Sequence, residues 1–241
     1  MSVQVTTLTI FCYPTLATKA WAFGMMQFAH QDLATVSGQQ FYKLMGSGRG
    51  LGFNPWPDWS TYALLQVWTD EAAATAFFTD SPLIQRYRAK TSGMTTIFLR
   101  ALRAHGRWSG QEPFAPFSTP DPDNPLVAVI TRATIRTRHL RKFWAYVPTS
   151  QRPIADAAGL IYTKGIGEIP VKQMATFSVW ENAERLTDFA YRSKEHRKAI
   201  YMTRDLDWYR EELFVRFQPY RTLGQMEGLA LPLPNAAYQS A

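Results

Sequence analysis

The sequence predicts an α+β chain made of two fused, diverged copies of one β-α-β-β-α-β unit. Three observations predict it. Two long stretches match each other around a shared tryptophan, a helical pattern separates the first two strand-like runs, and a proline-rich segment lies between the stretches. The chain has 241 residues, enough for two units of about 100 residues each, and its 46% hydrophobic residues can form a core for both.

Trp68 and Trp180 anchor the repeat, because the run that precedes each of them is typical of a strand. The matching runs are Tyr62-Ala-Leu-Leu-Gln-Val-Trp68 and Met174-Ala-Thr-Phe-Ser-Val-Trp180, and the same offset pairs Phe77 with Phe189 and Ser81 with Ser193. Further upstream, Phe41-Tyr42 before Gly46-Ser-Gly48 corresponds to Ile161-Tyr162 before Gly165-Ile-Gly167. Residues 5–11 and 127–135 open the copies with β-branched runs, and residues 95–99 and 213–217 close them.

A helix is expected between the first two strands of each copy. In the second copy, Leu140, Phe143, Trp144 and Val147 form one apolar stripe at helical spacing. The corresponding segment 16–34 has apolar side chains on several sides, namely Trp21, Phe23, Met25, Met26 and Phe28. Such a helix is covered on more than one side. It either packs between the sheet and a partner subunit, as in a homodimer, or lines an apolar ligand cavity.

This order of elements is the ferredoxin-like plan, and two copies in one chain can pair into an α/β barrel. We expect an N-terminal repeat at 1–111, a linker at 112–125 with five prolines, and a C-terminal repeat at 126–224. The tail at 225–241 has little charge and no periodicity, so we expect a loose or partner-bound extension.

Composition excludes several classes of protein. Lys and Arg exceed Asp and Glu by 26 to 19, but the basic residues are scattered and no nucleic-acid motif is present, so we expect no nucleic-acid partner. The single Cys12 excludes an internal disulfide and fits a reducing compartment. The N-terminus lacks a signal-peptide pattern, and no run approaches the roughly 20 apolar residues of a spanning helix. We therefore expect a cytoplasmic protein, with peripheral contact to the inner membrane as the alternative.

One position differs between the copies in an informative way. Ser81-Pro82 is a typical helix start, and three residues after the matched serines the first copy has Ile84 where the second has His196. His196 is either a core or partly exposed histidine with an ordinary partner, or a ligand of metal or haem. A helix N-terminus disfavours the charged imidazole, and one histidine suffices for haem iron but not for zinc. His30, His105 and His139 are expected to be structural or solvated.

No other catalytic motif is present. The sequence has no Gly-x-Ser-x-Gly elbow and no phosphate-binding Gly-rich motif ending in Lys and Ser or Thr. The glycines from Gly46 to Gly52 follow a strand but precede Asn54-Pro-Trp-Pro57 and no helix, which argues against a dinucleotide site. They form either a surface loop or a loop over a ligand.

Several patches resemble one known family in the same order along the chain. They include Ala20-Trp-Ala-Phe-Gly-Met-Met26, Lys43-Leu-Met-Gly-Ser-Gly48, Gly106-Arg-Trp-Ser-Gly110, Val127-Ala-Val-Ile-Thr-Arg-Ala-Thr134, Lys164-Gly-Ile-Gly-Glu-Ile-Pro170, Thr176-Phe-Ser-Val-Trp180 and Trp208-Tyr-Arg-Glu-Glu-Leu213. The chain thereby resembles the spheroidene monooxygenase family of acyclic carotenoid ketolases. Leu51, where the family's loop has an acidic residue, and segment 54–59 depart from the pattern, which bears on the substrate.

The resemblance implies a monooxygenase that hydroxylates or ketolates a hydrophobic, carotenoid-like substrate with dioxygen and an electron donor, a reductase or ferredoxin. The plan is also similar to chlorite dismutase and aldoxime dehydratase, which implies haem in the C-terminal half with His196 on the iron. The resemblance also implies candidate site residues. Arg132 and Arg216 would contact iron-bound oxygen or haem propionates, or else form salt bridges, while Trp180, Phe177 and Trp208 would line the pocket or pack in the core. The rival functions are a haem lyase resembling aldoxime dehydratase, a haem or apolar-ligand carrier, and a duplicated domain without a cofactor.

Overall fold

The computed structural model describes residues 3–233 except 53, 152–153, 155 and 193–207. The strands are β1 (Val5–Cys12), β2 (Gln39–Gly48), β3 (Pro57–Trp68), β4 (Gly93–Gly106), β5 (Val127–Ile135), β6 (Leu160–Ile169), β7 (Gln173–Trp180) and β8 (Tyr209–Leu223). The helices are α1 (Leu16–Leu33), α2 (Glu71–Asp80), α3 (Pro82–Arg88), the 3₁₀ turn η1 (Thr137–His139), α4 (Leu140–Gln151) and α5 (Ala183–Arg192).

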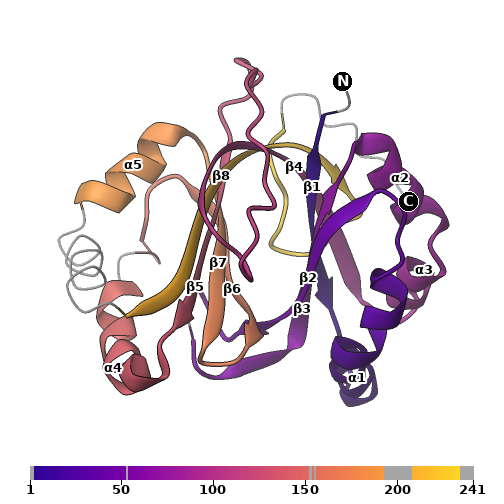
Figure 1. The fold of residues 1–241 in the computed structure, drawn as a ribbon, viewed down its shortest axis with the longest axis horizontal. Coiled ribbons are helices and arrows are strands. Elements are labelled where there is room, and N and C mark those ends of the chain that lie inside the picture. The colour runs from indigo at the N-terminus through magenta and orange to yellow at the C-terminus, as the bar shows by residue number, and fades with distance from the viewer. Residues whose placement is uncertain (1–2, 53, 152–153, 155, 193–207, 234–241) are drawn as a thin grey trace.

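The strands close an antiparallel barrel in the order β1-β3-β2-β6-β7-β5-β8-β4. The two halves meet along β2–β6 and along β4–β8. Helices α1, α2 and α3 cover the outside of the first half, and α4 and α5 lie against the outside of the second half on the opposite side of the barrel (Figure 1). The predicted fold of two fused ferredoxin-like repeats in one α/β barrel is confirmed.

The two halves repeat the same register and the same aromatic contact. Val5 pairs with Trp68 across β1 and β3, and Val127 pairs with Trp180 across β5 and β7. The ring centroids of Trp68 and Phe77 lie 5.2 Å apart, and those of Trp180 and Phe189 lie 5.1 Å apart. The anchors of the predicted repeat therefore occupy equivalent places in three dimensions.

The inside of the barrel is a filled core. Alternate residues of every strand point inward, and an eight-stranded barrel is just wide enough for side chains to fill it. Phe114 from the segment between the halves packs against Phe217, with ring centroids 5.3 Å apart, in this same cluster. Side chains fill the interior of the barrel, so we place no ligand site there.

The C-terminal tail corrects the expected loose extension as far as residue 233. Leu229, Leu231 and Leu233 are buried in the barrel core, and Met226 packs against it. The described part of the tail is neither helix nor strand, so its apolar residues follow no regular spacing. Single leucines, separated by alanine and proline, pack against the core. Residues 234–241 lie outside the described part of the chain.

The outward faces of the two halves are packed differently. In the first half one continuous cluster, including Phe11, Trp68 and Phe98, joins the sheet to its helices. In the second half the described residues form two separate clusters. One gathers Met174 and Trp208 against α4, and the other gathers Val129 and Trp180 against α5. Among the described residues, no helix has both the length and the apolarity to cross a bilayer.

Candidate functional site

A row of strand residues runs across the outer face of the second half, between the α4 and α5 clusters. Cross-strand pairing places its members side by side in the order His105, Phe214, Thr131, Thr176 and Gly165. Their inward-pointing neighbours, such as Leu213 and Val215, belong to the barrel core, so the row faces outward. We call these five residues the open row, because Thr131 and His105 are exposed and Phe214 is 36% exposed.

The equivalent row of the first half is closed. The shared register makes Thr9 of β1 the counterpart of Thr131, and Thr9 pairs with Leu64 and Thr96 as Thr131 pairs with Thr176 and Phe214. Thr9, Leu64 and Thr96 are each 0% exposed. The two copies therefore share a backbone plan, but the second exposes a strip of sheet that the first keeps in its core.

Two arginines lie side by side next to the open row. Arg103 of β4 pairs with Arg216 of β8, and Arg216 pairs with Val129 of β5, one outward step along the strands from Phe214 and Thr131. The Arg216 Nε atom is buried and has no hydrogen-bond partner among the described residues. A buried donor without a partner is costly, and guanidinium groups are well suited to binding carboxylates. The pair is therefore a candidate anion site.

Arg132 lies on the other side of the sheet. Its guanidinium is fully buried inside the barrel mouth, 3.6 Å from Glu168 and in a close ion pair with Glu211. It also lies over the ring of Trp108, with 5.7 Å from Cζ to the centroid. This placement favours the salt-bridge alternative for Arg132, because a ligand on the outer face that reaches Arg216 does not reach the barrel mouth.

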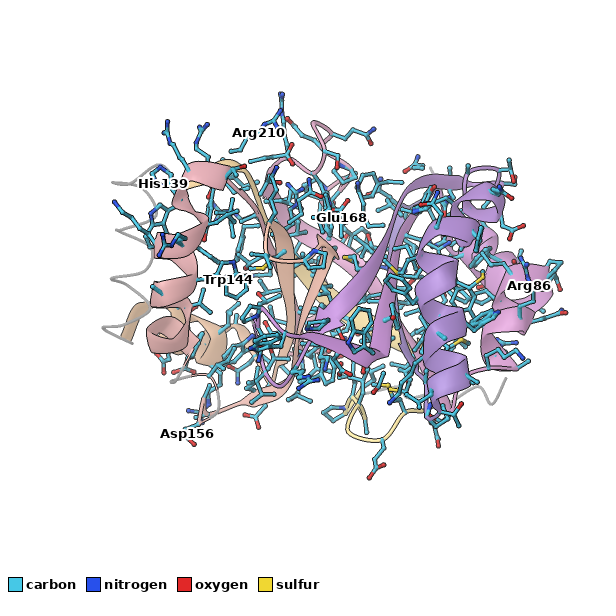
Figure 2. All side chains as sticks on the ribbon, turned by 90° about the horizontal axis from the view of Figure 1, so that it is seen from below. Arg86, His139, Trp144, Asp156, Glu168 and Arg210 are labelled. Carbon is cyan, nitrogen blue, oxygen red and sulfur yellow. The ribbon has the colours of Figure 1, made fainter. Side chains whose placement is uncertain are left out.

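The carboxylates around Arg132 are held by further donors. Glu168 is labelled near the middle of Figure 2. It accepts a hydrogen bond from Trp108 Nε1 at 2.7 Å and forms an ion pair with Lys43 at 2.7 Å. Burial alone would raise the pKa of Glu211, but the backbone N–H groups of Gly110 and Ser109 and the charge of Arg132 lower it below its usual value. The cluster ties the segment after β4 to strands of the second half.

The predicted aromatic residues do not share one pocket. Phe177 points into the barrel core, while Trp180 and Trp208 lie on the outer face, in the α5 and α4 clusters respectively. The two tryptophans thus border the open row from opposite sides. His196 lies outside the described residues. Its counterpart Ile84 is 0% exposed, so the side chain at this position of the first copy points into apolar surroundings, as the repeat predicts.

A cavity of about 220 Å³ lies where the two halves join at β2 and β6. Figure 2 shows that strands lie between helix α4 and helix α1. Helix α1 contributes Phe23 and Met26 to the cavity, the hairpin of β2 and β3 contributes Trp59, and β7 contributes Met174. Glycines of β2 and β6 form its floor, and a Cβ placed on Gly46 would meet nothing within 4 Å. We call this space the seam cavity.

Comparison with models of known protein families found no match. The chain is 34% identical over 226 residues to the spheroidene monooxygenase of Cereibacter sphaeroides, covering 93% of this chain and 69% of that protein. It is equally similar to the spheroidene monooxygenase of Rhodobacter capsulatus, with 93% of both chains covered. The chain belongs to the spheroidene monooxygenase family. It is thus an oxidoreductase of the monooxygenase class, as the sequence patches predicted.

The barrel of this family member is also found in solved structures. A crystal structure of aldoxime dehydratase superposes with a TM-score of 0.58 at 11% identity, covering 90% of this chain and 81% of that one. At this level of identity the likeness shows the shared fold of two fused ferredoxin-like units.

Sequence reasoning missed Arg103 and the open row, and it gave a cavity lined by the first helix only as an alternative. A signal for the cavity was present, because the matched glycine pairs Gly46/Gly48 and Gly165/Gly167 all contribute to its lining. The alternative that α1 lines a cavity agrees with the positions of Phe23 and Met26. A sequence signal for the open row was also present. Leu64, a core aliphatic residue of the first copy, corresponds to Thr176, a hydroxyl residue, in the second.

Proposed function

We propose that this chain is a haem-dependent monooxygenase that hydroxylates, and by a second oxidation ketolates, an apolar carotenoid-like substrate. The names of its relatives support the reaction and the substrate class. The observation that carries the haem proposal is the open row beside Arg103 and Arg216, since it offers a strip of sheet exposed at His105, Phe214 and Thr131 and a cationic pair in the half that the sequence implicated.

The residues present fit a haem group. Haem has a broad apolar face and two propionate groups, and Thr131, Thr176 and Gly165 provide short side chains over which a flat ring can lie. Arg103 and Arg216 would hold the propionates, which would also provide a partner for the buried Nε of Arg216. His196, which lies outside the described residues, would be the iron ligand.

Haem iron, when bound, supplies the activation of dioxygen, with axial ligation and distal polarity tuned by the protein. One oxygen atom enters a C–H bond, and the other is reduced to water with two electrons and two protons from outside. An electron donor, a reductase or ferredoxin, is therefore part of the proposal. A second hydroxylation at the same carbon gives a geminal diol, which loses water to give the ketone.

The chain's own part is to bind and to exclude water. Trp180 and Trp208 border the open row with buried apolar surface, and the Trp180 indole N–H is already bonded to Ser178 at 2.9 Å. An apolar border of this kind keeps water from the reacting carbon, which strengthens electrostatic interactions within the site.

An absorption spectrum of the purified chain titrated with haem tests the proposal, with His196→Ala as the decisive variant. We expect a Soret band in the wild type that is shifted or lost in His196→Ala and unchanged in His30→Ala. His30 is the matched control because it lies on α1 of the first half, with Nδ1 3.0 Å from the Tyr42 hydroxyl. No Soret band in the wild type would end the haem proposal.

His105→Ala belongs in the same experiment, because His105 is the member of the open row that has an imidazole. A band that depends on His105 and not on His196 would retain haem and reassign its ligand. Turnover of a polyene only in the presence of reductant supports the monooxygenase. Turnover of an oxime by ferrous protein without a donor would instead support the lyase.

A further inference from the structure

We propose that the seam cavity binds one end of the elongated apolar substrate and directs the rest of its chain toward the haem proposed at the open row. The inference rests on the proposed function for the identity of the ligand, an isoprenoid or polyene chain. It adds a binding site in the seam, which residues of both halves line, next to the outer face to which the haem is assigned.

The size of the cavity suits the end of such a chain. An apolar cavity of about 150 Å³ holds benzene, so one of about 220 Å³ has room for roughly nine carbon atoms. That is about two isoprene units. A longer polyene therefore has to leave the cavity, and the direction in which the floor continues decides where it goes.

The two carboxylates and Ser47 of the lining have partners within the protein, whereas the buried Tyr62 hydroxyl has none among the described residues. Asp58 is in an ion pair with Lys164 at 2.8 Å, Ser47 donates to the backbone oxygen of Thr61 at 2.8 Å, and Glu168 is engaged by Lys43 and Trp108. Burial alone would raise the pKa of Asp58, but the contacts with Lys164 lower it overall. A ligand in the cavity therefore meets apolar surface, glycine backbone and the Tyr62 hydroxyl, and the two carboxylates of the lining are already paired.

The floor of the cavity leads directly into the open row. Gly165 belongs to both, and it pairs with Thr176, which pairs with Thr131, which pairs with Phe214. The path from Gly165 to Phe214 crosses three strand spacings of about 4.8 Å each. Every residue between its ends has a short side chain, so a chain that leaves the cavity at Gly165 can reach a haem held over the open row without displacing the α4 or α5 cluster.

Exposed aromatic rings mark the mouth of the cavity. Phe23 is 59% exposed and Trp59 is 48% exposed, and their rings meet edge to face with centroids 5.4 Å apart. Both residues line the cavity. Large apolar side chains gathered around a hollow are typical of a site that receives an apolar ligand.

Gly46→Leu is the decisive variant, because Gly46 lines the cavity and a Cβ added there would meet nothing within 4 Å. Gly24→Leu is the matched control. Gly24 lies on α1, does not line the cavity, and its added Cβ would make only ordinary contact with Phe28 at 3.8 Å. The probe is all-trans-retinol, an isoprenoid polyene whose fluorescence rises in apolar surroundings, titrated into the full chain with and without added haem.

We expect Gly46→Leu to raise the Kd for retinol at least tenfold while Gly24→Leu leaves it unchanged. Phe23→Ala, a change on an exposed helix face that does not threaten folding, should also weaken binding severalfold. Equal retinol affinity in wild type, Gly46→Leu and Phe23→Ala would overturn the inference. A changed sedimentation coefficient in Phe23→Ala with unchanged retinol affinity would also overturn it and would make the patch a contact between two copies of the chain.

Haem uptake by the same proteins separates this inference from the proposed function. Retained haem binding with lost retinol binding in Gly46→Leu is the expected result and supports both. Retinol binding that depends on Gly46 in a chain that takes up no haem would leave the seam cavity standing and remove the haem proposal.

Discussion

Thr9 and Thr131 occupy the same place in the two halves of the barrel, yet Thr9 is fully buried and Thr131 is exposed. Each is the middle of three paired strands at the same register. In the first half a cluster that joins sheet and helices covers the position, and in the second half the two clusters formed by the described residues leave it between them. Duplication thus produced one closed half that supports the barrel and one half with usable surface.

Thr131→Trp should fill the open row and lower haem affinity at least tenfold in a Soret titration. The thermal midpoint should stay within a few degrees of wild type, because an exposed strand position tolerates a residue of high β-propensity. Thr131→Ser, which keeps the small side chain, serves as the control. Unchanged haem affinity in Thr131→Trp would place the haem elsewhere.

Arg216→Met should change stability and haem affinity in opposite directions. Removing a buried donor that lacks a partner among the described residues should stabilise the haem-free chain by about 1 kcal/mol. Loss of one charge-assisted contact to a propionate should weaken haem binding about tenfold. Urea unfolding and a haem titration on the same sample check both parts. Arg216→Lys should restore part of the affinity, and a variant that loses stability as well as affinity would indicate a structural role only.

Arg132→Met should lower the free energy of unfolding and leave the haem affinity unchanged. Its guanidinium is buried between Glu168 and Glu211, and removing one partner of a buried ion pair costs about 3–5 kcal/mol. Urea unfolding should show this loss, while the folded variant should bind haem as the wild type does. A normal free energy of unfolding together with lost haem binding would return Arg132 to the site.

The different fates of these two arginines could not be predicted from sequence. Arg132 and Arg216 lie on different strands, so the faces they occupy depend on the register between β5 and β8, which pairs Val129 with Arg216 and Arg132 with Leu213. The repeat was predictable for the opposite reason. Trp68 and Trp180 are large, buried and set in matching strand patterns, so local sequence alone aligns the copies.

The exposure of Thr131 was not predictable, because it depends on what the helices leave uncovered. The same limit applies to the tail. Leu229, Leu231 and Leu233 have no helical or strand period, and their burial follows from the open end of a barrel that only the closed fold creates. Residues whose environment is set by distant elements escape an analysis of local patterns.

Leu231→Ala should therefore destabilise the chain as a core substitution does. Leu231 is 2% exposed within the barrel cluster, and such a truncation costs about 2–5 kcal/mol. Urea unfolding measures the change, with Glu227→Ala at an exposed position of the same tail as the control. Equal stability of the two variants would mean that the tail does not belong to the core in solution.

Glu211 should give the chain an acid-sensitive step in stability. Its pKa is lowered in the folded state below its ordinary value of 4.5, so the unfolded chain binds its proton more readily. The resulting stabilisation is fully present above pH 4.5 and is lost as the pH falls from there through the folded pKa. Glu211→Gln should remove this slope from the curve of unfolding free energy against pH. Glu212→Gln, the exposed neighbour, should keep the slope, and an equal slope in wild type and Glu211→Gln would show that the ion pair with Arg132 does not contribute.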